Sequence, residues 1–159
     1  MKIQLIWAQN ESGGIGKQGQ LPWHISEDLK NFKHLTLNQP VVMGRITWES
    51  LPFKPLPKRR NIVLSHSKLD EVECYTSVKY CVESLREDDI PSVFVIGGAN
   101  IYASFLDLAT DLHITLVKEN VEGIDCYFPI TINCLTDDFK PIEEYSISQT
   151  ATYTHWIRK

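Results

Sequence analysis

The chain has 159 residues, the length of one domain, and 43% of them are hydrophobic and 23% charged. Its net charge of −4 gives no reason to expect nucleic acid or an anionic membrane as a partner, and no stretch approaches the roughly 18 apolar residues of a membrane span. The four cysteines are scattered, so we expect reduced thiols in a cytoplasmic protein rather than the alternative, a disulfide framework.

The first predicted element is a strand over residues 3–8, an almost wholly apolar run that indicates burial on both faces. A loop over residues 9–23 follows and carries Gly13, Gly14, Gly16 and Gly19. A glycine-rich loop of this length in a compact domain is typical of a mobile functional segment. We therefore predict a lid that delivers Leu21 and Trp23 to the next helix.

A helix is predicted from Ser26, because its apolar residues gather on one side at about 100° per residue. Asp28 falls inside this apolar stripe, whereas its neighbour Glu27 faces away. Two interpretations stay open for Asp28. It is either an exposed first-turn carboxylate that complements the helix dipole, or a desolvated carboxylate that waits for a ligand.

The rest of the chain alternates strands and helices, which predicts one α/β domain with a mainly parallel sheet. No helix is predicted between Pro129 and Ala151, so the last strand is expected to be antiparallel. Ser77 is predicted to cap one helix, and Ile101, Phe105 and Leu108 to face inward on another. The predicted strands are 40–44, 61–64, 73–75, 92–96, 111–117 and 151–157; helices begin at 45, 78 and 99, and loops cover 51–57 and 118–129.

Two strand–glycine–helix junctions, VVMGRITWES and VFVIGGANIY, could bind an anion through free helical N–H groups. Two such junctions at one sheet edge could hold both ends of a dinucleotide, although the G-x-G-x-x-G fingerprint is absent. Arg45 and the Ser65–Ser67 cluster suit a phosphate monoester, and Arg59 suits an anionic tail, with solvated turns as the alternative. The five histidines lie apart in sequence, so no metal site is predicted.

Five segments in this order and spacing resemble dihydrofolate reductases of the bacterial type: IWAQ, GIGKQGQLPWHISEDLKNFK, VVMGRITWESL, PLPKRRNIVLS and VIGGANIY. The similarity runs from Met1 to about Pro129, with a looser fit beyond. It implies an eight-stranded sheet with four helices, NADPH as hydride donor, and reduction of 7,8-dihydrofolate to tetrahydrofolate. It also implies binding of antifolate inhibitors, and we expect a monomer.

The resemblance assigns roles to individual residues. Asp28 matches the acid that hydrogen-bonds the pterin ring, with Leu21 and Trp23 beside it, and Arg59 matches the clamp on the glutamate carboxylate. The other matches to the substrate pocket are Ile6, Trp7, Ala8, Leu29, Phe32, Ser50, Leu51, Leu56, Ile96 and Thr115. The matches to the cofactor site are Ala8, Ile15, Gly16, Gly44, Arg45, Ile46, Thr47, Leu64, Ser65, His66, Ser67, Ile96, Gly97, Gly98, Ala99, Asn100, Ile101 and Tyr102, and the family holds Gly97–Gly98 in a cis peptide.

Four positions depart from the family pattern. Ser26 stands where a proline is usual, Leu21 replaces a common methionine, and SLPFKPLP is one residue longer than the commonest version. EGIDCYFP carries an insertion, which leaves the role of Asp125 open. Two alternatives remain: a reductase of the same fold that acts on a pyrimidine of riboflavin synthesis, and a non-catalytic nucleotide-binding module. The LPW-x4-D segment argues against the first, and the presence of both Asp28 and Arg59 argues against the second.

Overall fold

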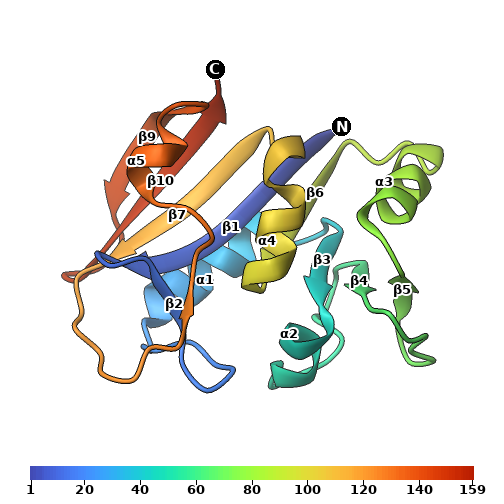
Figure 1. Ribbon diagram of the computed structural model, residues 1–159, viewed down its shortest axis with the longest axis horizontal. Helices are drawn as coiled ribbons and strands as arrows, with labels where there is room; N and C mark the ends of the chain where they lie inside the picture. Colours follow the sequence, from blue (N-terminus) through green and yellow to red (C-terminus); the bar gives the residue numbers. More distant parts are fainter.

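The computed structural model describes all 159 residues, which fold around one eight-stranded sheet (Figure 1). The strand order is β5-β4-β3-β6-β1-β7-β10-β9, and every pairing is parallel except the two that β10 makes. This confirms the predicted mostly parallel sheet with an antiparallel C-terminal strand. The bounds are β1 Lys2–Asn10, β3 Val41–Gly44, β4 Asn61–Leu64, β5 Glu73–Tyr75, β6 Ser92–Gly97, β7 Asp111–Val117, β9 Phe139–Ser146 and β10 Ala151–Arg158.

Helices cover both faces of the sheet, because the central strands are apolar on both sides. Helices α1 (Ser26–Thr36) and α2 (Arg45–Ser50) pack on one face, where Ile6, Met43 and Phe94 form the core. Helices α3 (Val78–Glu87), α4 (Ala99–Phe105) and the one-turn α5 (Ile132–Leu135) pack on the other. Figure 1 shows α4 in front of the sheet and α1 behind it.

Several predicted bounds match the structure. The predicted strands 61–64, 73–75 and 111–117 coincide with β4, β5 and β7, and the helix predicted to begin at Arg45 is α2. Ser77 caps α3, since its side chain accepts a hydrogen bond from the backbone N–H of Tyr80. The Gly97–Gly98 peptide is cis, as the resemblance implied, and all four cysteines carry free thiols.

Two predictions for the α4 region and the C-terminal region were wrong. Leu108 is 44% exposed instead of facing inward, because the helix tightens into a 3₁₀ turn at Leu106–Leu108 and rotates that side chain outward. The residues between Pro129 and Ala151 contain α5 and the whole of β9, neither of which was predicted from the residues. Strand β9 lies at the sheet edge with almost all its side chains exposed, so its sequence lacks a buried apolar face.

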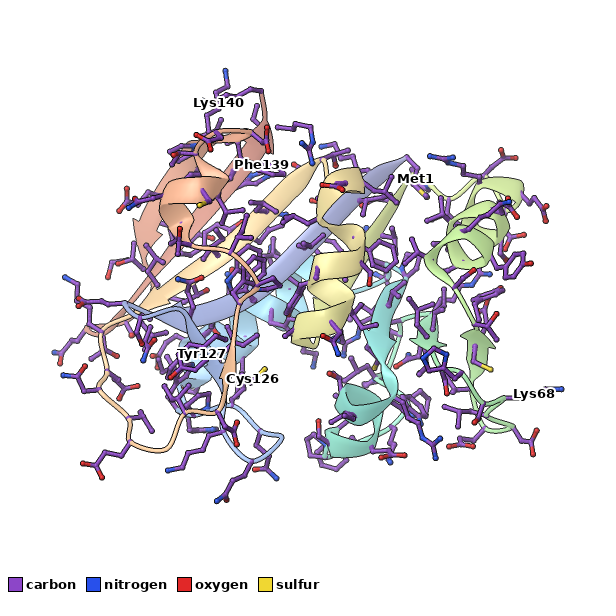
Figure 2. All side chains as sticks on the ribbon, in the orientation of Figure 1. Met1, Lys68, Cys126, Tyr127, Phe139 and Lys140 are labelled. Atoms are coloured by element: carbon purple, nitrogen blue, oxygen red, sulfur yellow. The ribbon has the colours of Figure 1, made fainter.

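The two long loops pair with each other instead of remaining irregular. Residues Gly14–Gly16 form β2, which pairs with β8 (Cys126–Tyr127) in a separate two-stranded sheet. Figure 2 shows Cys126 and Tyr127 beside the chain that follows β1. Close contact explains the glycine at position 14, since a Cβ there would lie 2.7 Å from Cδ1 of Ile124. No helix in the structure has the length and apolar character needed to cross a membrane.

Candidate active site

The carboxyl ends of β1, β3, β4, β6 and β7 meet at one edge of the sheet, the lower edge in Figure 1. Helix α2 and the β2–β8 pair lie at this edge, and α1 begins there. In open parallel sheets, ligands bind outside the carboxyl ends of the strands, in the crevice at the point where the strand order reverses. Most of the predicted site residues belong to this edge.

Asp28 lies in the first turn of α1 and is half-buried against β7. Its Oδ1 accepts a hydrogen bond from the Thr115 hydroxyl at 2.7 Å, and it takes part in none of the ion pairs. Burial raises the pKa of Asp28, and the Thr115 hydrogen bond opposes that rise. Glu27 is exposed. Of the two interpretations left open above, the structure therefore supports the desolvated carboxylate.

An apolar wall lies next to Asp28 on the same face of the sheet. Ile6 is buried there, and the half-buried side chains of Phe32, Leu51, Leu56 and Ile96 pack against the cluster that contains it. Leu29 is 40% exposed, beyond the packed part of this wall. An apolar surface beside a single carboxylate is typical of a pocket for a flat, largely apolar ligand with a few polar groups.

The loop before α1 contributes a second group of side chains. Trp23 is buried with Ala8 and Ile25, and its indole N–H has no partner within the protein, so it can donate to a bound molecule. Leu21 is 52% exposed. Asp125 accepts a hydrogen bond at Oδ2 from the backbone N–H of Gln18 at 3.0 Å, which ties the predicted lid to the β7–β8 loop.

Two residues predicted at the site face the opposite side of the sheet. The Trp7 ring stacks on Phe128 at 3.8 Å, and the Tyr102 ring lies 5.7 Å from Trp7 in the core under α4. The Tyr102 hydroxyl donates to the Ile6 carbonyl at 2.7 Å. Strand periodicity gives the reason, since Ile6 and Trp7 must point to opposite faces. Trp7 and Tyr102 therefore lie on the face under α4 and can affect the ligand-binding edge only through the backbone of β1.

The two glycine junctions lie side by side, because β3 and β6 are neighbours. Gly44 and Gly98 are the N-caps of α2 and α4, and neither helix has a side-chain cap on its first N–H groups. A Cβ at Gly44 would lie 2.9 Å from Cγ1 of Ile101, and Gly97 has φ +125° with a prospective Cβ 3.2 Å from the Tyr102 hydroxyl. These contacts require glycine and let the two junctions pack closely, so that the uncapped N–H groups at the starts of α2 and α4 lie near each other for an anion to bind.

The other predicted cofactor residues surround these junctions. Arg45 pairs with Glu49 at 2.8 Å on the exposed side of α2, and Ile46 is 75% exposed beside it. The segment Leu64–Ser67 leaves β4 at the same edge and is exposed at His66 and Ser67. The remaining matches to the cofactor site are Ile15 and Gly16 in β2, Thr47 in α2, and Ala99, Asn100 and Ile101 at the start of α4. Ser50, which matches the substrate pocket, donates from its hydroxyl to the Thr47 carbonyl.

The adjacent arginines Arg59 and Arg60 contact different elements of the fold. Arg59 donates from Nη1 to the Thr36 hydroxyl at 3.1 Å, and from Nε to the Pro57 carbonyl at 3.0 Å, so its guanidinium lies at the end of α1. Arg60 instead forms ion pairs with Glu73 and Asp88, both at 2.8 Å. Of these two arginines, Arg59 alone has no acidic partner, which leaves it available to an anionic ligand.

Comparison with known proteins places the chain in a family. The dihydrofolate reductase family model matches residues 2–157. The dihydrofolate reductase of Neisseria meningitidis serogroup A is 46% identical over 162 residues, covering 99% of both chains, and that of Mycobacterium leprae is 46% identical over 120 residues, covering 72% of both. The structure of the Enterococcus faecalis enzyme superposes with a TM-score of 0.85 at 30% identity, covering 99% of this chain and 96% of that one. A family match of nearly full length and a shared fold lead to one conclusion: the chain belongs to the dihydrofolate reductase family.

Proposed function

We propose that the protein reduces 7,8-dihydrofolate to 5,6,7,8-tetrahydrofolate with NADPH, by hydride transfer to pterin C6 and protonation at N5. The observation that carries this proposal is Asp28, a carboxylate without a cationic partner on an apolar wall at the ligand-binding edge. A pterin presents an amidine-like fork of N–H donors, which a carboxylate can accept with both oxygens. Asp28 would hold the ring at this fork and stabilise its protonated form electrostatically.

The residues at the edge fit the phosphates and nicotinamide of the cofactor. The contact of a prospective Cβ at Gly44 with Cγ1 of Ile101 at 2.9 Å shows that only glycine lets the two junctions pack this closely. Backbone N–H groups of Gly44–Thr47 and Gly97–Ile101 would bind the pyrophosphate, and Ser65–Ser67 with Arg45 the 2′-phosphate. When bound, NADPH supplies the hydride. The Enterococcus faecalis relative was solved in complex with NADP(H) and RAB-propyl, which supports the same cofactor here.

Three further residues would position the substrate and exclude water. The Trp23 indole N–H would donate to a bound water or to the ligand beside Asp28, and Leu21 would cover the ring from the lid. Arg59, free of acidic partners, would hold the glutamate carboxylate by a bidentate contact. Closure of the lid would strengthen these interactions by removing water.

We further propose a cytoplasmic monomer that binds antifolate inhibitors at the pterin site. The unpaired thiols of the four cysteines fit a reducing compartment. An antifolate with an amidine-like ring edge would satisfy Asp28 in the same way as the substrate.

The decisive experiment measures the loss of NADPH absorbance on addition of dihydrofolate, repeated with NADH and with a pyrimidine intermediate of riboflavin synthesis. We expect turnover with NADPH and dihydrofolate only. NADPH binding without consumption would favour the non-catalytic module instead. The matched variants are Asp28→Asn, which should reduce neutral-pH turnover by more than about 100-fold, and Glu27→Gln, which should leave it unchanged. If Asp28→Asn kept activity within a few-fold of wild type, the role proposed for Asp28 would be wrong.

A further inference from the structure

A cluster of metal-ligating side chains lies between β7 and β10, away from the ligand-binding edge. Asp111 and His113 are alternate residues of β7, and His155 is the antiparallel partner of His113 on β10. Alternate residues share one face of a strand, and directly opposed residues are its closest cross-strand neighbours. One ligand atom of each residue lies within 4.8 Å of those of the other two.

Neighbouring residues fix the orientation of the His113 ring. Its Nδ1 lies 2.6 Å from the Tyr153 hydroxyl, and its Nε2 lies 2.8 Å from Oε1 of Gln4. Whichever nitrogen bound a metal ion, the other would keep a hydrogen-bonding partner. Such outer partners are the usual support of a ligating histidine, because they set its tautomer and ring direction.

Asp111 is supported in the same way. One carboxylate oxygen, Oδ2, lies 2.8 Å from Nε2 of His155, and the other, Oδ1, accepts a hydrogen bond from the Thr110 hydroxyl at 2.7 Å. The His155 and His113 rings are stacked with centroids 4.4 Å apart. The cluster therefore has a carboxylate held at one oxygen by Thr110 and bonded at the other to one imidazole, on which the second imidazole stacks.

The exposure of the cluster also suits a divalent cation. Asp111 is almost fully buried, whereas the His155 side chain is 20% exposed and leaves an entry from solvent. Two imidazole nitrogens with one carboxylate oxygen form a set that zinc accepts, with a fourth position open.

We propose that Asp111, His113 and His155 form a zinc site that joins β7 to β10, with Gln4 Oε1 or a water as the fourth ligand. Zinc–ligand bonds of about 2.1 Å place tetrahedral ligand atoms about 3.4 Å apart. A pair at the 4.8 Å limit must then close by about 1.4 Å, which rotation of the half-buried His155 can provide. The three residues are up to 44 positions apart, so only the strand pairing reveals the site.

The test titrates the chelator-treated, full-length protein with Zn²⁺ by calorimetry and with Co²⁺ by visible spectroscopy. We expect one ion per chain, the absorption of tetrahedral Co²⁺, and a thermal midpoint that rises with zinc concentration. Nitrogen NMR of the wild-type histidine side chains should show the signals of His113 and His155 shifting together. No activity measurement is needed, so the outcome is independent of the proposed reductase function.

Two variants make the test specific. His155→Asn removes the most exposed ligand and should weaken zinc binding by more than about 100-fold, beyond the 10–100-fold that loss of an outer partner costs. His34→Asn, at an exposed position of α1, should bind zinc as the wild type does. Circular dichroism confirms that both variants are folded. Absence of saturable binding by the wild type, or equal affinity in His155→Asn, would overturn the proposal.

Discussion

The hydrogen bond between Thr115 and Asp28 makes a quantitative prediction about stability and pH. Thr115→Val keeps the size and the β-branched shape of the side chain but removes the hydroxyl that donates to Asp28 Oδ1 at 2.7 Å. Thr115 is buried in β7, so water cannot readily replace the lost donor. The variant therefore isolates one hydrogen bond to a half-buried carboxylate.

The loss of unfolding free energy in Thr115→Val depends on whether Asp28 is ionised. A hydrogen bond to a charged group contributes about 1.5–3 kcal/mol, whereas one between neutral groups contributes about 1 kcal/mol. Thr115→Val should therefore lower the free energy of unfolding by about 1.5–3 kcal/mol where Asp28 is ionised, and by about 1 kcal/mol where it is protonated. The hydroxyl lowers the pKa of Asp28, so its removal must raise that pKa further.

The sign of the pH dependence follows from linkage. Burial already raises the folded-state pKa of Asp28 above the ordinary value of 3.8, so this group makes folding less favourable as pH rises through the folded pKa. The variant widens the difference between the folded and unfolded pKa values. Its loss of stability relative to the wild type should therefore be largest near neutral pH and should shrink as the pH falls through the folded pKa of Asp28.

The assay is urea unfolding of wild type and variant at several pH values between about 4 and 8. Thr154→Val is the control, because Thr154 is equally buried on β10 and its hydroxyl has only neutral partners. It donates to the Ile114 carbonyl at 2.8 Å and accepts a hydrogen bond from the Trp156 indole N–H at 2.9 Å. Its loss of stability should not depend on pH in this range. The reasoning is refuted if Thr115→Val shows the same pH-independent loss as the control.

Two further predictions concern groups at the edges of the site. Arg59→Gln should raise the KM for dihydrofolate by about 10–100-fold, the equivalent of about 1.5–3 kcal/mol. Arg60→Gln should leave KM unchanged and lower the free energy of unfolding by about 1 kcal/mol, because it loses the pairs with Glu73 and Asp88. A raised KM in Arg60→Gln and an unchanged KM in Arg59→Gln would exchange the roles of the two arginines. Asp125→Ala should speed amide hydrogen exchange at Gln18 about 5–10-fold, because it removes the acceptor of that N–H, and Glu122→Ala in the same loop should not. Equal exchange in the two variants would mean that Asp125 does not hold the lid.

Strands and helices with strong local signals were predictable from sequence. Strand β4 is a short apolar run between polar residues, and Ser77 stands at the N-cap of α3, where its side chain has a local partner. Strand β9 was not predictable from the residues, because an exposed edge strand has no buried apolar face and is held only by pairing with β10. The β2–β8 pairing joins residues more than a hundred positions apart, which no local pattern encodes.

The site residues also divide into features that a local sequence pattern predicted and features that only the fold reveals. Helical periodicity singled out Asp28 over Glu27, but its partner Thr115 lies 87 residues away on β7. Arg59 and Arg60 are adjacent and identical in type, and only the positions of Glu73 and Asp88 in the fold separate them. The face on which Trp7 lies was predictable from the sequence, since side chains alternate along a strand and Trp7 follows Ile6 in β1.

The incomplete hydrogen bonding of Asp28 is best explained by the need to keep a ligand site open. An arginine or lysine beside the carboxylate would offset its desolvation, yet its side chain would occupy the space in which a pterin edge has to lie. Thr115 supplies one donor from the sheet below and leaves the second carboxylate oxygen free of protein partners. The remaining desolvation, expressed in the raised pKa, makes folding less favourable at neutral pH. A ligand that donates to both oxygens removes that penalty on binding. The desolvation of Asp28 in the free protein therefore favours ligands with an amidine-like edge over ligands without one.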